Sequence, residues 1–476
     1  MESLPLHSLH VGGRWISPGT DETIAVENPA TEEIVGRIPA CGANDARRAV
    51  DAARAAFPAW SATGTATRAG YLTALRDALV ENQAEMADLI TREMGSPRAF
   101  SQRVQVGLPV KVLEAYAREL TGNEAGEERI GHSVVVREAA GVVAAITPWN
   151  YPLHQMVAKV GAALAAGCTI VLKPSEIAPL SAYFLTTLIE GTGLPAGVFN
   201  LLPGQGAVAG RALAADPGVD VVSFTGSLAA GREVGSAAGL GVKKVCLELG
   251  GKSATLVLSD ADLATAVEDG VRGALHNAGQ TCTARSRLLV PRARLDEAVD
   301  VARSVLTEYV PGDPTDPGCR LGPLVSRAQR DRVLEHLRRA AHDGAQQVAG
   351  PERGDVPDIG HYVAPSVWTR VDPTSPLAQE EIFGPVLAVL PFDDDADAVA
   401  QANETRYGLA ATVWSEDTER ATNVARRLRV GQVDINDARF NPAAPFGGYR
   451  QSGVGRELGR HGIEEFQEIK SLQLPS

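Results

Sequence analysis

A cysteine and a glutamate stand in two neighbouring glycine-containing runs just past the middle of the chain. Cys282 lies within the run G-Q-T-C-T-A at 279–284, and Glu248 begins the run E-L-G-G-K-S at 248–253. A single cysteine is most often a small buried hydrophobic residue. A cysteine among small polar residues, with a carboxylate in another loop, also fits a nucleophile with a base for its second half-reaction. These two residues alone leave both interpretations open.

Another run whose side chains could take part in a reaction, T-P-W-N-Y-P at 147–152, follows a predicted strand. Ligands of open α/β sheets bind at the carboxyl ends of the strands, where such a run would lie. The carboxamide of Asn150 could donate an N–H to a developing oxyanion. Trp149 and Tyr151 between prolines are equally explained as a cap on the core, and by itself the run favours that explanation.

The run L-K-P-S-E at 172–176 ends a second predicted strand. Lys173 and Glu176 could both hydrogen-bond the hydroxyls of a ribose, and a glutamate would repel a 2′-phosphate, which favours NAD over NADP. A solvated ion pair at a strand end explains the same residues, and the two interpretations stand about even.

Glycines near two further strands suggest a phosphate site without matching the usual fingerprint. The run F-T-G-S at 224–227 closes a strand and opens a helix, where backbone N–H groups and Ser227 would suit a pyrophosphate. An ordinary serine helix cap is the simpler explanation of this run alone. The run 204–210 spaces its glycines as G-x-G-x-x-x-G, so any dinucleotide would bind in a variant manner.

Short apolar runs alternate with helix-length segments around these residues. Continuous apolar residues are typical of strands that are buried on both faces in a parallel sheet. Strand, helix, strand, repeated, predicts a doubly wound α/β domain. The predicted strands are 142–146, 169–172, 198–202, 219–224, 244–247 and 254–258.

Predicted helices flank the strands on both sides of the chemistry-bearing runs. Upstream, 44–57 and 66–93 are predicted as two helices, with Asn44 as the N-cap of the first. Segment 179–190 is a third, with Pro179 in its first turn. After Cys282, a second α/β region begins with a strand at 287–291. Apolar residues at helical spacing from 295 to 310 and a polar helix at 327–343 follow, and 122–136 suggests a β-ribbon.

Bulk properties exclude several classes of protein. The chain has 476 residues, 44% hydrophobic and 22% charged, so we expect an ordinary globular protein of two or three domains. Its net charge of -13 argues against nucleic acid or an anionic membrane as the main partner. The start of the chain has no secretory pattern, and the near-apolar stretch 160–172 is too short for a bilayer. We therefore expect a cytoplasmic protein.

The cysteines are scattered and odd in number, at Cys41, Cys168, Cys246, Cys282 and Cys319. With no Cys-x-x-Cys and no Cys/His cluster at ligand spacing, neither a disulfide framework nor a metal site is predicted.

Taken together, the runs closely resemble the NAD(P)-dependent aldehyde dehydrogenase superfamily. The likeness extends from N-P-A-T at 28–31 to R-E at 456–457 and includes, besides those above, G-Q-T-C, E-E-I-F-G-P-V and P-F-G-G-Y. As a set, these runs are very specific. The resemblance implies a doubly wound parallel-sheet cofactor domain (1–120 and 140–249), an α/β catalytic domain (250–460), and an oligomerisation ribbon and tail (121–139 and 461–476) that form dimers or tetramers.

The resemblance also implies a role for each residue. Cys282 would be the nucleophile, Glu248 the general base and Asn150 a donor of the oxyanion hole, in a reaction that oxidises an aldehyde to the acid through a thioester. NAD is the expected cofactor, with NADP less favoured. Its expected contacts are Pro148, Trp149, Lys173, Ser175, Glu176, Thr225, Gly226, Ser227, Leu249, Gly250, Glu381 and Phe383.

The aldehyde is the expected small-molecule partner, and some residues of its expected access tunnel differ from those common in the family. Expected tunnel residues are Tyr151, His154, Gln155, Ala158, Thr281, Thr283 and Phe446. Ala158 stands where an aromatic residue often occurs, which suggests a roomier tunnel, and His154 adds polarity as a wall residue. A medium or bulky aldehyde, with a polar group, fits this mixture. Asp434 also stands where an aromatic residue is frequent, and Arg450 stands where lysine is common; neither should touch the chemistry.

Two alternatives remain open at this stage. Transfer of the same thioester to coenzyme A would give an acyl-CoA, but relatives with that activity generally lack a base equivalent to Glu248. A non-catalytic protein could keep the fold, since fold alone does not determine function. Intact Cys282, Glu248 and Asn150 argue against it.

Overall fold

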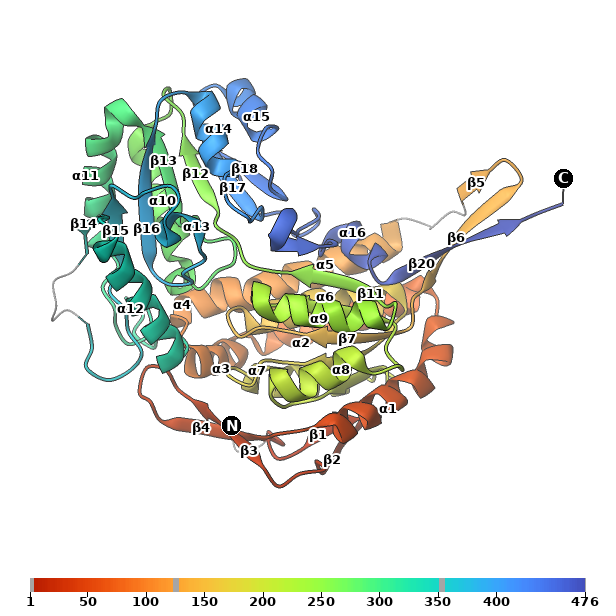
Figure 1. The fold of residues 1–476 in the computed structure, drawn as a ribbon. Helices are drawn as coiled ribbons and strands as arrows, with labels where there is room; N and C mark the ends of the chain where they lie inside the picture. Colours follow the sequence, from red (N-terminus) through yellow and green to blue (C-terminus); the bar gives the residue numbers. More distant parts are fainter. Residues whose placement is uncertain (1–3, 123–127, 351–355, 476) are drawn as a thin grey trace.

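The computed structural model describes residues 4–122, 128–350 and 356–475. Two large sheets, each covered by helices, form the body of the molecule, and a small sheet projects from it (Figure 1). The predicted α/β class with a doubly wound parallel sheet is confirmed.

The first sheet has the strand order β19-β11-β10-β7-β8-β9-β1-β2, and its five central strands are parallel. Its strands are β1 (Leu9–Val11), β2 (Arg14–Ile16), β7 (Val142–Ile146), β8 (Thr169–Lys173), β9 (Phe199–Leu201), β10 (Val221–Thr225), β11 (Lys244–Glu248) and β19 (Gly453–Val454). Every residue of β7, β8 and β10 is buried, as continuous apolar runs predict.

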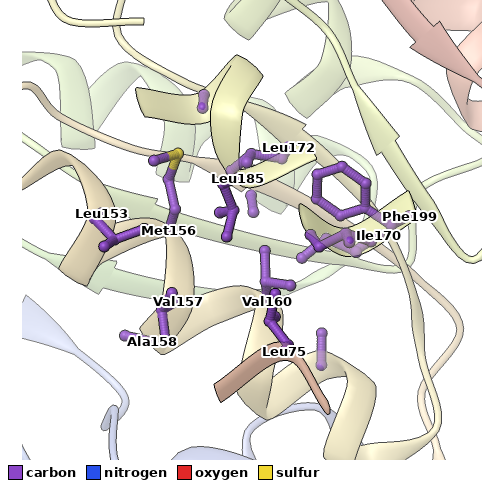
Figure 2. Close-up of a cluster of buried hydrophobic side chains, with 14 of the residues drawn as sticks. Leu75, Leu153, Met156, Val157, Ala158, Val160, Ile170, Leu172, Leu185 and Phe199 are labelled. Carbon is purple, nitrogen blue, oxygen red and sulfur yellow. The ribbon is translucent and has the colours of Figure 1, made fainter. Parts of the chain in front are cut away.

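Alternate residues of these strands face two helical layers. Val143 and Ala145 of β7 pack in the core under α2, α3, α5, α6 and α7, whereas Val142 and Ala144 pack in the core under α1, α8 and α9. Figure 2 shows part of the first core, where α6 lies against β8. The helices are α1 (Ala43–Ser61), α2 (Thr65–Glu81), α3 (Gln83–Met94), α5 (Gly107–Gly122), α6 (Pro152–Ala166), α7 (Leu180–Gly191), α8 (Arg211–Ala215) and α9 (Leu228–Leu240).

Two predicted helix boundaries are wrong. The segment 66–93 is two helices rather than one, because the chain leaves helical geometry at Asn82, whose amide donates to the Ala78 carbonyl (2.8 Å). Helix α1 begins at Ala43 with Gly42 as its N-cap, so Asn44 lies inside the first turn. There the buried Asp45 carboxylate accepts from the Gly42 N–H (3.4 Å), and this side chain supplies the capping that was assigned to Asn44.

The second sheet has the order β14-β15-β16-β13-β12-β17-β18, and only β14 is antiparallel to its neighbour. Helix α11 ends at Leu306, so Val310, predicted on its apolar face, lies beyond the helix and is exposed. The strands are β12 (Ala254–Val257), β13 (Arg287–Pro291), β14 (Gln346–Ala349), β15 (Ser366–Thr369), β16 (Val386–Phe392), β17 (Ala410–Trp414) and β18 (Gln432–Ile435). The helices are α10 (Leu263–Leu275), α11 (Leu295–Leu306), α12 (Arg327–His342), α13 (Pro376–Gln379), α14 (Asp395–Asn403) and α15 (Thr418–Ala425).

The projecting sheet joins distant parts of the chain. Its strands are β5 (Glu128–Ile130), β6 (Ser133–Ala139) and β20 (Gln467–Gln473), and β20 runs antiparallel to β6 from Gln467 opposite Ala139 to Gln473 opposite Ser133. In Figure 1 it extends away from the body and ends at the C-terminus. Part of the predicted ribbon, 123–127, lies outside the described residues. A separate hairpin pairs β3 (Thr23–Glu27) with β4 (Ile34–Pro39).

One short strand near the C-terminus belongs to the first sheet. Segment 453–454 was grouped with the catalytic range 250–460, yet it forms β19 at the edge of the first sheet, beside β11. In the part of the chain that the structure describes, no helix is long and apolar enough to cross a membrane, and no group of three or more His, Cys, Asp or Glu is arranged to hold a metal.

Candidate active site

Cys282 lies in a loop whose backbone is held in an unusual conformation. The loop follows α10, and the three consecutive residues Asn277, Ala278 and Gly279 have positive φ angles of 53°, 57° and 73°. A β-carbon on Gly279 would lie 2.0 Å from the carbonyl oxygen of Gly384. Only glycine allows this approach, so the loop before Cys282 is locked against the segment that follows Phe383.

A buried hydrogen-bond network connects this loop to Asn150. The side chain of Asn277 donates to the Asn150 carbonyl (2.8 Å), and so does that of Gln105 (3.0 Å). The Asn150 amide in turn donates to the carbonyl of Gln280, two residues before Cys282 (3.0 Å). Gln280 is held from its other side by the Val325 N–H (2.9 Å). The amide predicted to serve the oxyanion is therefore fixed in position relative to the cysteine loop.

Two cavities meet at the half-buried Cys282, and we name them after one aromatic lining residue each. The Phe446 cavity has a volume of about 260 Å³ and the Phe383 cavity about 310 Å³. Cys282 and Gln155 line both, while Asn150 lines the Phe383 cavity alone. A group in one cavity and a group in the other can therefore approach the same sulfur.

The Phe446 cavity gathers the residues expected to form the substrate tunnel, with one exception. It is lined by Tyr151, His154, Gln155, Thr281, Thr283 and Phe446. Ala158 does not line it: this residue is 1% exposed, and Figure 2 shows it in the buried cluster of α6. The expectation that Ala158 widens the tunnel is therefore wrong, because its position on α6 faces the helical core rather than the cavity.

The Phe383 cavity gathers most of the residues expected to contact the cofactor. The rings of Trp149 and Phe383 meet edge to face, with their centroids 5.3 Å apart. Ser227 caps α9 by accepting the Ala230 N–H (3.3 Å), so the positive end of that helix points toward the cavity wall. The expected residues that line this cavity are Pro148, Trp149, Thr225, Gly226, Ser227, Leu249, Gly250, Glu381 and Phe383.

The remaining expected cofactor residues lie outside that cavity. Lys173 is the last residue of β8, and Ser175 and Glu176 follow it. The buried Lys173 ammonium pairs with Glu176 (3.0 Å), and the Gly206 N–H donates to the same carboxylate (3.2 Å). The ion pair anticipated at this strand end is thus present, but its lysine is buried rather than solvated.

Burial shifts the pKa values of Cys282, Glu381 and His154. Burial, with the nearby Glu381 and Glu248 carboxylates, raises the pKa of Cys282 to about 12. Burial also raises the pKa of Glu381 to about 7, although its carboxylate accepts the Gly251 N–H (3.0 Å). His154 faces the Phe446 cavity with a pKa lowered to about 4 by burial and by Lys159, so it is neutral at neutral pH.

Glu248 lies behind the cavities rather than on their walls. It ends β11, is 2% exposed, and has no hydrogen-bond partner for either carboxylate oxygen among the described residues. A β-carbon on Gly447 would lie 2.5 Å from its Oε1 atom, so that glycine makes room for the carboxylate. Burial and the Glu457 carboxylate raise the pKa of Glu248 well above its ordinary value, and Lys159 partly opposes them. A carboxyl group in this state is a strong base once it is ionised.

Several residues of the site were missed at the sequence level. Lys159 of α6 forms a buried ion pair with Glu457 and donates to the Thr225 hydroxyl (2.7 Å). A lysine flanked by apolar residues in α6 was the available signal for Lys159, because a buried lysine requires a partner. Gln105 and Asn277 gave no comparable signal, since their role depends on backbone carbonyls that only the fold brings near.

The chain is similar to known proteins over almost its whole length. The model of the aldehyde dehydrogenase family matches residues 15–472. The chain is 46% identical over 469 residues to 3-succinoylsemialdehyde-pyridine dehydrogenase from a Pseudomonas species, covering 97% of each protein.

The fold is also similar to solved structures of aldehyde dehydrogenases. A mutant of aldehyde dehydrogenase C from Pseudomonas syringae, in complex with NAD+ and octanal, superimposes with a TM-score of 0.96 at 43% identity, over 98% of this chain and 96% of that one. The NAD+ complex of an aldehyde dehydrogenase from Bacillus cereus has a TM-score of 0.94 at 38% identity, over 98% and 96% of the two chains.

Proposed function

Because this chain belongs to the aldehyde dehydrogenase family, we propose that it oxidises an aldehyde to the carboxylic acid with NAD+, using Cys282 as nucleophile. The observation that carries this proposal is the position of Cys282 on the walls of both cavities. An aldehyde in the Phe446 cavity and a cofactor in the Phe383 cavity would then meet at one sulfur atom.

The first half-reaction forms a covalent bond to the sulfur. The Cys282 thiol releases its proton to solvent and the thiolate adds to the carbonyl carbon. The carbonyl oxygen becomes an oxyanion, which receives hydrogen bonds from the Asn150 side-chain amide and the Cys282 backbone N–H. Removing one such donor typically lowers the rate about 10²–10³-fold. The nicotinamide, when NAD+ is bound, supplies the acceptor for the hydride. Loss of that hydride from the carbon leaves a thioester on Cys282.

The second half-reaction releases the acid. Glu248 removes a proton from a water molecule, the hydroxide adds to the thioester carbon, and the carbon–sulfur bond breaks to give the acid and the Cys282 thiolate. The raised pKa of Glu248 supports this role, since it makes the carboxylate a better proton acceptor.

The residues present fit NAD+. The start of α9 supplies backbone N–H groups and Ser227 for a pyrophosphate, as expected of a helix N-terminus. Glu381 has a carboxylate suited to ribose hydroxyls, and Lys173 with Glu176 would hold the other ribose while disfavouring a 2′-phosphate. The NAD+ complexes of the relatives from Pseudomonas syringae and Bacillus cereus support the same choice.

The body of the substrate is proposed to be of medium size. One relative binds octanal, and another is named for a pyridine-bearing semialdehyde. Both are compatible with a cavity of about 260 Å³ that is lined in part by Phe440 and Phe446.

We extend the proposal to the whole chain. Segments 1–120 and 140–249 would carry the cofactor, 250–460 the catalytic cysteine, and 121–139 with 461–476 the contacts of a homodimer or homotetramer. The pairing of β6 with β20 supports the last assignment.

One experiment tests reaction type, cofactor and acceptor together. Formation of the reduced nicotinamide, NADH or NADPH, across a panel of aldehydes is followed with NAD+, with NADP+, and with NAD+ plus coenzyme A. We expect free acid with NAD+ and little activity with NADP+. Acyl-CoA without free acid would overturn the hydrolytic step, and failure to oxidise any aldehyde would overturn the function.

A further inference from the structure

Four polar residues that the proposed reaction does not use line the Phe446 cavity. They are Arg285, Thr412, Gln432 and Asp434, which we call the polar wall. Thr412 of β17 and Asp434 of β18 are register partners in parallel strands, so they lie side by side. Asp434 stands where an aromatic residue is frequent in the family that the sequence resembles, and here its carboxylate-bearing side chain lines the cavity.

The positive charge in the polar wall has an ion-pair partner, whereas the negative charge of Asp434 has none among the described residues. The guanidinium of Arg285 pairs with Asp269 (3.0 Å) and also donates to the Thr412 hydroxyl (2.9 Å). Asp434 receives a hydrogen bond from the neutral amide of Gln432 (2.9 Å), and no ion pair to it exists among the described residues. Since Asp269 neutralises Arg285, the wall retains one negative charge, on Asp434.

No other titratable lining group offsets that charge at neutral pH. Burial lowers the pKa values of His154 and His276 to about 4, so both rings are neutral. Burial also raises the pKa of Asp434, which shows that the carboxylate is incompletely hydrated, and Arg285 opposes this shift. An incompletely hydrated carboxylate gains more from a cation than an exposed one does.

The cavity also has apolar lining residues. Val104 and Leu108 line it together with Phe440 and Phe446, whose rings meet edge to face at 6.2 Å between centroids. The cavity therefore offers a sulfur nucleophile, apolar side chains for the body of a molecule, and an anionic anchor on the polar wall.

We propose that Asp434 determines substrate specificity by selecting aldehydes that carry a positively charged nitrogen remote from the carbonyl. The inference rests on the proposed aldehyde oxidation and names the substrate class for it. The aldehyde group of the substrate reaches Cys282, its hydrocarbon chain packs against Phe440 and Phe446, and its cationic end pairs with Asp434. An aldehyde that ends in a carboxylate is repelled by the same group.

Three aldehydes with the same three-methylene chain test this inference. They are 4-trimethylammoniobutanal, its neutral isostere 5,5-dimethylhexanal, and the anionic 5-oxopentanoate. With the wild-type enzyme we expect kcat/KM to decrease in that order, with the cation favoured over the isostere by about tenfold, the factor for one partly screened charge pair. A neutral or anionic preference in the wild-type enzyme would overturn the inference without any variant.

Matched variants assign the effect to one carboxylate. Asp434→Asn should lower the cation-to-isostere ratio of kcat/KM about tenfold, mainly through KM of the cationic aldehyde, as expected for lost ground-state binding. Asp437→Asn removes the same charge from an exposed position three residues away that does not line the cavity, and it should preserve the ratio.

Failures of the two proposals are distinguishable. An unchanged ratio in Asp434→Asn, or an equal loss in Asp437→Asn, overturns the role of Asp434 while aldehyde oxidation stands. If none of the three aldehydes, nor any in the broader panel, gives NADH, the proposed function itself fails.

Discussion

Burial raises the pKa values of Cys282, Glu248 and Glu381. The Glu381 and Glu248 carboxylates raise the pKa of Cys282 further, because a thiolate would share a poorly hydrated region with two groups that become negative. The ligand-free enzyme therefore holds its nucleophile as a thiol, which limits reaction with adventitious electrophiles before an aldehyde arrives.

The first prediction concerns the pH dependence of this thiol. A pKa raised to about 12 leaves Cys282 protonated at neutral pH, and the thiolate fraction grows about tenfold per pH unit below the pKa. Alkylation of ligand-free enzyme by iodoacetamide should therefore accelerate without a plateau up to about pH 10. Mass spectrometry of the Cys282 peptide measures this rate, Cys282→Ala gives the background, and a plateau near about pH 8 would contradict the expectation.

A second prediction separates the two half-reactions. Glu248→Gln removes the proposed base and leaves Cys282 in place, so one NADH per active site should form rapidly, followed by turnover reduced about 10²–10⁴-fold. Intact-protein mass spectrometry should detect the acyl adduct on Cys282. If the first NADH also fails to form in a folded variant, Glu248 acts before the thioester, and its assignment to hydrolysis is wrong.

At the scale of elements, the site depends on loops that close against one another at distances only small residues permit. The Cys282 loop passes Gly384 at Gly279, and Phe383 itself has a positive φ of 62°. A non-glycine residue in this conformation stores strain that the surrounding packing must hold in place.

Substitution of Gly279 should therefore be costly. Gly279→Ala combines a φ of 73° with a β-carbon 2.0 Å from the Gly384 carbonyl oxygen, and we expect a loss of at least about 2 kcal/mol in the free energy of unfolding. Gly70→Ala is the control, because Gly70 lies in α2 with nothing within 4 Å of an added β-carbon. Chemical denaturation measures both, and equal stability of the two variants would contradict the close approach.

The whole molecule brings distant segments to one site. Helix α6 and the chain near residue 457 meet in the Lys159–Glu457 ion pair, while Gly447 makes room for Glu248 at the end of β11. Beyond the body, the sheet of β5, β6 and β20 carries exposed apolar side chains at Ile130, Ile469 and Leu472. A projecting sheet with such a surface is suited to association with a second copy.

This surface gives a prediction about assembly. Ile469→Glu combined with Leu472→Glu should lower the mass of the particle in solution, because charged side chains would be buried without partners at the proposed contact. Multi-angle light scattering after size-exclusion chromatography measures the mass. Val310→Glu alters a residue of similar exposure outside this sheet and should leave the assembly intact. An unchanged mass in the double variant would show that the contacts lie elsewhere.

The sequence by itself determined the parallel sheets, most of the strand positions and the identity of the chemical groups. Continuous apolar strands and runs such as those around Cys282 and Glu248 are local patterns, so they can be recognised from the sequence without knowledge of the fold. Only the tertiary structure decided which side chains face which space. It placed Ala158 in the core, Asp434 on the cavity wall and Lys159 beside Glu457, because these outcomes depend on contacts between residues far apart in the chain. Charge balance in the cavity follows from those contacts, and no local pattern contains it.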